Sequence, residues 1–129
     1  MSMRSAVERL VRDRLGCSCP EAVFARIGLD YRGGSPPEVD LRIGGRLLVH
    51  LRRPGAAPDA EAALPEWLAR GRDTRDAEGL NRFRLVLGLA ADSADVERLQ
   101  ARFRTLSGGD PRLHLHLLPP DELDEVLGG

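Results

Sequence analysis

A glycine pair between two alternating segments constrains the fold of this 129-residue chain more than any other feature. Apolar and polar residues alternate over 39–43, Gly44 and Gly45 follow, and a second alternating segment covers 47–52. Such alternation is typical of β-strands, because successive side chains point to opposite faces. Two adjacent glycines supply the positive φ angles that a type I′ turn requires. The sequence therefore predicts an antiparallel hairpin over 39–52.

Helical and extended segments alternate after this hairpin. Apolar residues recur every three or four positions in two segments, which predicts helices over 59–77 and 94–106, the second capped by Ser93. The segment 83–90 is apolar enough for a strand buried on both faces. The other predicted elements are helices over 2–15, 20–27 and 121–127, a last strand over 112–118, and a further strand over 29–32 that would lengthen the sheet.

The predicted order is helix, helix, two or three strands, helix, strand, helix, strand, helix. It favours the α/β class, with α+β as the alternative. A helix between 83–90 and 112–118 places these two strands parallel, whereas the hairpin is antiparallel. We therefore expect a mixed sheet of four or five strands flanked by helices. No repeat or long linker divides the chain, so residues 1–129 are predicted to form a single globular domain.

Composition narrows the classes of function. Apolar residues make up 42% and charged residues 30% of the chain, the balance of a soluble globular protein. A net charge of −1 and 4% aromatic residues favour neither nucleic acid nor an anionic membrane as partner. All nineteen basic residues are arginine, which excludes chemistry that needs a lysine. No signal peptide or membrane span is apparent, so we expect a cytoplasmic protein.

The two cysteines, Cys17 and Cys19, lie just before Pro20, which is well placed to begin a helix. Backbone N–H groups at a helix start favour the thiolate form. Two thiolates can bind a soft metal or close into a strained disulfide that is readily reduced. The alternative is a structural role, with one cysteine capping the helix and the other buried in the core.

His114 and His116 form a second candidate pair. In a strand they share a face, with Cα atoms ~6.6 Å apart. Their imidazoles can complete a tetrahedral site with Cys17 and Cys19 for a zinc or iron-type ion. Alternation offers another interpretation, since the leucines beside them would face the core and the histidines the polar side. His50 is likewise predicted on the polar face of the hairpin.

The order of helix, strands, helix and strand, together with the hairpin, resembles the PD-(D/E)xK nuclease-like architecture. The resemblance matches Asp40 with the first metal carboxylate, His50 with the second carboxylate and Arg52 with the lysine. A nuclease needs the second carboxylate to hold Mg²⁺ and a group that assists the attacking water. Because arginine is a poor proton acceptor, the resemblance implies a nuclease-like shape without nuclease activity.

The cysteine segment carries a second resemblance. The segment 15–24, LGCSCPEAVF, resembles the C-x-C-P-x-x-V-F motif of a family of short uncharacterised prokaryotic proteins. In that family the motif precedes a glycine-turn hairpin similar to 43–48, and segments similar to 79–83 and 113–116 extend the resemblance over most of the chain. This resemblance implies no activity, substrate or cofactor.

Three hypotheses follow, in decreasing order of support from the sequence. The first is a non-catalytic binding or accessory protein without a cofactor, because no catalytic set is complete and arginine-rich surfaces suit protein partners. The second is a thiol redox or metal-binding protein that uses Cys17 and Cys19. The third is a nuclease-like enzyme.

Overall fold

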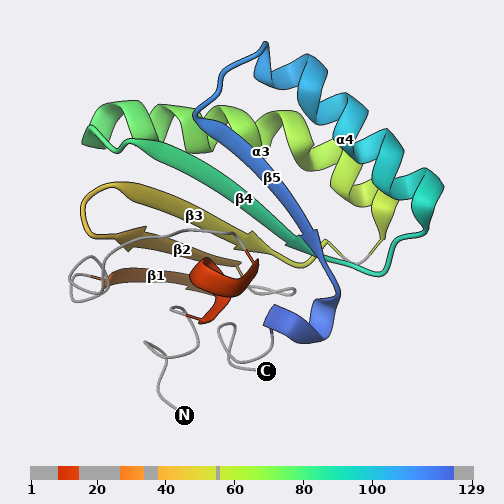
Figure 1. Ribbon diagram of the computed structural model, residues 1–129, viewed down its shortest axis with the longest axis horizontal. Coiled ribbons are helices and arrows are strands. Elements are labelled where there is room, and N and C mark those ends of the chain that lie inside the picture. The colour runs from red at the N-terminus through yellow and green to blue at the C-terminus, as the bar shows by residue number, and fades with distance from the viewer. Residues whose placement is uncertain (1–8, 15–26, 34–37, 55, 124–129) are drawn as a thin grey trace.

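The computed structural model describes residues 9–14, 27–33, 38–54 and 56–123 (Figure 1). Within these residues, five strands form one mixed sheet in the order β1-β2-β3-β4-β5. The first three strands are antiparallel neighbours, whereas β3, β4 and β5 run parallel. The strands are β1 (Ile27–Gly33), β2 (Glu38–Ile43), β3 (Leu47–Arg52), β4 (Arg82–Gly88) and β5 (Leu113–Leu118). The predicted α/β class and mixed sheet are confirmed, and the further strand before the hairpin is part of the sheet.

The predicted hairpin is present as β2 and β3. Gly44 and Gly45 have φ angles of 62° and 67°, as a type I′ turn requires. The Arg46 N–H closes the turn by donating to the Ile43 carbonyl at 3.1 Å. The Arg46 carbonyl then accepts the Asn81 N–H at 2.6 Å, which ties the turn to the start of β4.

Two helices connect the parallel strands, α3 (Ala57–Glu78) from β3 to β4 and α4 (Ser93–Ser107) from β4 to β5. Each ends at a glycine in the left-handed region, Gly79 and Gly108. The predicted cap of α4 is wrong, because Asp92 rather than Ser93 is the N-cap residue. Its carboxylate accepts the Asp95 N–H at 2.8 Å.

The two ends of the chain differ from the predicted helices where the structure describes them. The π-helix η1 (Leu10–Arg14) lies within the first predicted helix. Ile27 begins β1 instead of ending a helix, and the rest of the predicted segment 20–27 lies outside the described residues. A 3-10 helix, η2 (Pro120–Leu123), occupies the described part of the predicted helix 121–127.

The sheet is covered on both faces (Figure 1). Helices α3 and α4 lie on one face, and η1 and η2 lie on the other. The core on the α3 side includes Leu48, Leu64, Leu68, Phe83, Leu85 and Leu99. The core on the opposite side includes Leu10, Val11, Val49, Leu51, Val86 and Leu123. No helix of the described residues is long and apolar enough to cross a membrane.

Candidate functional site

Three polar side chains are buried beneath α3: Asp40 of β2, and His50 and Arg52 of β3, each 1% exposed. We call them the buried charge cluster. Asp40 and His50 are direct partners in the antiparallel register, and Arg52 lies two residues further on the same face. The sequence placed His50 on a polar strand face, but the structure buries that face. The cause is α3, which packs on it through residues such as Leu64.

An ion pair holds the buried charge cluster together. Arg52 Nη2 lies 2.9 Å from Asp40 Oδ1, and His50 Nε2 lies 3.6 Å from the same oxygen. Arg52 Nη1 donates to the carbonyls of Leu51 and Val39 at 3.0 and 3.3 Å. A buried carboxylate without a counter-charge is strongly destabilising, so Arg52 makes the burial of Asp40 tolerable.

The geometry of the buried charge cluster can be compared with the metal site that the nuclease-like resemblance implies. Asp40, His50 and Arg52 come together in the hairpin. However, the Asp40 carboxylate faces a permanently charged guanidinium, which would repel a divalent cation. Within the described residues, no three His, Cys, Asp or Glu side chains are grouped closely enough to hold a metal ion.

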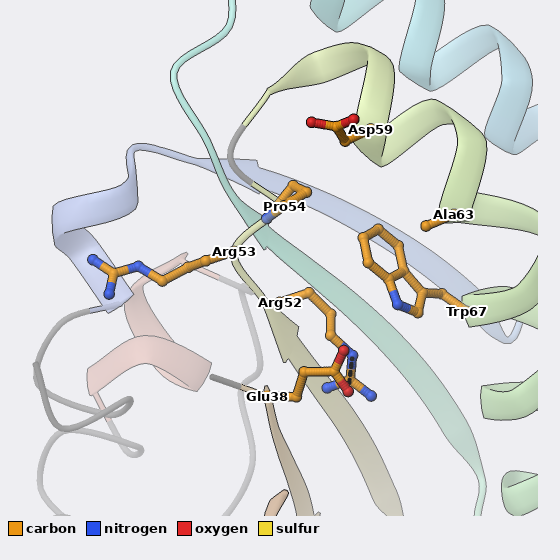
Figure 2. A pocket seen from close by; sticks show the side chains of 7 residues that line it. All are labelled: Glu38, Arg52, Arg53, Pro54, Asp59, Ala63 and Trp67. Atoms are coloured by element: carbon orange, nitrogen blue, oxygen red, sulfur yellow. Dashed lines mark ion pairs between the residues drawn. The ribbon is translucent and has the colours of Figure 1, made fainter. Parts of the chain in front are cut away.

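A pocket of about 210 Å³ opens beside the buried charge cluster, at the carboxyl end of β3 (Figure 2). Ligands of α/β proteins bind most often at this end of parallel strands. Asp59, Ala63 and Trp67 line one wall and lie four residues apart, on one face of α3. Trp67 is half-buried and packs against the core. The complete lining is Glu38, Arg52, Arg53, Pro54, Asp59, Ala63 and Trp67, which we call the Trp67 pocket.

The lining of the Trp67 pocket contains two carboxylates, Glu38 and Asp59, and two guanidiniums, Arg52 and Arg53. Arg52 is shared between Asp40 and Glu38, whose Oε2 lies 3.6 Å from Arg52 Nε. Arg53 points away from the indole in Figure 2, and its Nη2 donates to a backbone carbonyl of η2 at 3.2 Å. Asp59 makes no ion pair within the described residues. The pocket thus combines an aromatic wall with one carboxylate, Asp59, that makes no ion pair within the described residues.

The predicted metal ligands separate into two groups. Cys17 and Cys19 lie outside the described residues, so the thiol redox and metal hypotheses stay predictions. His114 and His116 lie on β5, on the sheet face opposite α3, and are half-buried. A metal ion at these imidazoles would have to displace the contacts that they make with arginine.

Each of these histidines accepts a hydrogen bond from an arginine of β4. Arg82 Nη1 lies 3.3 Å from His114 Nε2, and Arg84 Nη1 lies 2.9 Å from His116 Nε2. Because a guanidinium can only donate, both Nε2 atoms are unprotonated. Burial, then Arg84 and His114, lower the pKa of His116 to about 4. Burial, then Arg84 and Arg82, lower the pKa of His114 as well.

Arg75 of α3 is buried beside two carboxylates. It is 5% exposed, and its Nε and Nη1 lie 3.0 and 3.1 Å from carboxylate oxygens of Asp76 and Asp110.

The sequence analysis did not predict the Trp67 pocket. The spacing of Asp59, Ala63 and Trp67 was the available signal, since residues four apart share a helix face.

Comparison of the chain with protein-family models, with curated proteins and with solved structures finds no match.

Proposed function

We propose that this chain is a non-catalytic binding protein, and that its Trp67 pocket takes up a cationic side chain of a protein partner. The observation that carries the proposal is the indole of Trp67 in one wall with Asp59, a carboxylate that makes no ion pair within the described residues. A guanidinium is attracted both to the face of an indole and to carboxylates. Glu38 and Asp59 supply the carboxylates at the rim.

The buried charge cluster supports the non-catalytic part of this proposal. Asp40 is the carboxylate that the nuclease-like resemblance would assign to the metal, and it is paired with Arg52 at 2.9 Å. With its charge balanced inside the protein, this carboxylate stabilises the fold instead of activating water. We expect no cleavage of DNA or RNA in the presence of Mg²⁺ or Mn²⁺. Cleavage that disappears in Asp40→Asn would refute the non-catalytic assignment.

Binding can be followed directly, because Trp67 is the only tryptophan of the chain. The probe is a short blocked peptide, acetyl-Gly-Arg-Gly-amide, and its control has citrulline in place of arginine. Citrulline keeps the shape of the arginine side chain but carries no charge. We expect a saturable change in tryptophan fluorescence with the arginine peptide and binding at least about tenfold weaker with citrulline, the effect of losing one charged hydrogen bond.

Two variants locate the binding site. Asp59→Asn should weaken binding of the arginine peptide while keeping the size and shape of the side chain. Asp73→Asn, an exposed position further along α3, is the matched control and should leave binding unchanged. Equal affinities for the arginine and citrulline peptides, or equal losses in the two variants, would contradict the proposed cation pocket.

A further inference from the structure

The far face of the sheet carries a second polar group of side chains, formed by Arg82, Arg84, His114 and His116. We call it the arginine–histidine cluster. Arg84 and His114 are direct partners in the parallel register of β4 and β5, and Arg82 and His116 flank them on the same face. The apolar residues Val86 and Leu118 continue this face toward η2. The cluster thus occupies the amino-terminal ends of β4 and β5, away from the Trp67 pocket.

From this arrangement we infer that the arginine–histidine cluster binds the phosphate group of a small ligand. Arg82 and Arg84 are alternate residues of one strand, so their Cα atoms lie ~6.6 Å apart. At this distance both guanidiniums can reach one tetrahedral anion. A phosphate has enough oxygen atoms to accept paired hydrogen bonds from both, whereas one carboxylate is satisfied by a single guanidinium.

The positive charge of the cluster is uncompensated in the part of the chain that the structure describes. None of its four members forms an ion pair with a carboxylate there, and each arginine donates to a neutral imidazole instead. Asp110 is the acidic residue whose charge acts on the pKa of His114, and it already pairs with Arg75. Burial, followed by the charge of Arg82, lowers the pKa of Arg84. An anion would relieve the repulsion between the two guanidiniums.

Arg84 also has a hydrogen-bond donor, Nε, for which no described residue supplies an acceptor. This Nε atom is buried. Buried polar atoms are nearly always satisfied, so this donor requires an acceptor beyond the described residues, and a bound anion would supply one. His116 fixes one side of the same guanidinium at 2.9 Å, so the group is already oriented. Arg82 is exposed and gives the anion access.

The size and charge of the molecule favour a small ligand over a nucleic acid. The net charge is −1, and only 4% of residues are aromatic, so the chain offers neither a long positive track nor a stacking surface. Four side chains on two strands match one phosphate group better than an extended backbone.

Inorganic pyrophosphate is the probe for this inference, and the ring signals of His114 and His116 are followed by NMR. Sodium chloride at the same ionic strength is the control salt. We expect saturable shifts of both rings with pyrophosphate and none with chloride. Arg84→Gln should weaken binding at least tenfold. The matched control is Arg102→Gln, at an exposed position of α4 on the other side of the sheet, and it should leave the affinity unchanged.

Arg82→Gln provides a second variant if Arg84→Gln fails to fold, since Arg82 is exposed. It should also reduce the affinity for pyrophosphate. Equal shifts with chloride, or unchanged affinity in both arginine variants, would overturn the inference. So would binding of an oligothymidylate without binding of pyrophosphate, because that result would assign the cluster to nucleic acid.

Discussion

Gly71 determines how closely α3 approaches the sheet. It is buried within the helix, and a Cβ atom built on it would lie 2.2 Å from Cε2 and Cζ of Phe83. The Phe83 ring is fully buried and meets the His50 ring edge to face, with 4.8 Å between centroids. The ring therefore packs against both the backbone of Gly71 and the His50 ring. A glycine inside a helix normally weakens it, and here close packing explains its presence.

Gly71→Ala should destabilise the protein by about 1–3 kcal/mol, the usual cost of overpacking a core. This is the net loss, because the steric overlap of a Cβ atom 2.2 Å from the ring outweighs the gain of about 1 kcal/mol that alanine gives in helix propensity. Urea denaturation of the parent and the variant measures the difference. The same substitution in a Phe83→Leu background should cost less, because the smaller side chain leaves room. Additive effects of the two substitutions would contradict this account.

Predictions about single residues succeed where the two-residue period of a strand is enough to assign a side chain to one face of the sheet. The alternation of the hairpin correctly placed Asp40, His50 and Arg52 on one strand face. It did not predict their burial, because burial depends on α3, whose position over that face is a tertiary property. The same holds for Arg75, whose partner Asp110 is 35 residues away in the chain.

At the scale of elements, the sequence predicted the presence of the helices more accurately than it predicted the residue at which each helix begins. The start of α4 shows why. Asp92 and Ser93 are both favourable N-cap residues, so composition alone does not distinguish between them. In the structure Asp92 has extended backbone angles, and its side chain reaches the Asp95 N–H. Ser93 is already the first residue of the helix.

Asp92→Ala should therefore cost about 1 kcal/mol of stability through loss of the cap. Ser93→Ala is the matched control and should change the stability by no more than about 0.5 kcal/mol, as is usual at exposed positions. Thermal unfolding of the three proteins compares the two effects. A larger loss in Ser93→Ala than in Asp92→Ala would restore the capping role that the sequence suggested.

At the scale of the whole molecule, the element order was sufficient to predict the mixed sheet. Short connections force the hairpin strands to be antiparallel, whereas helical crossovers place β3, β4 and β5 parallel. The candidate sites were harder to predict, because each combines residues distant in sequence. The Trp67 pocket joins β2, β3 and α3, and the arginine–histidine cluster joins two strands across α4.

The arginine–histidine cluster also makes the stability of the fold depend on pH. In the unfolded chain His116 has an ordinary pKa near 6.5, whereas burial and then Arg84 lower its pKa to about 4 in the folded protein. Between these two values the unfolded chain binds more protons than the folded one, so stability rises with pH. The contribution of His116 is present above pH 6.5 and is lost as the pH falls toward 4.

His116→Gln tests this dependence, because glutamine keeps an acceptor for Arg84 but does not titrate. We expect the free energy of unfolding of the parent to fall between pH 6.5 and pH 4 more steeply than that of the variant, with the two curves running parallel above pH 7. Urea denaturation at a series of pH values gives both curves. Arg102→Gln, which leaves the cluster intact, should follow the parent. Parallel curves for the parent and His116→Gln throughout this range would show that His116 titrates equally in the folded and unfolded chains, and that the buried Arg84 contact does not hold it neutral.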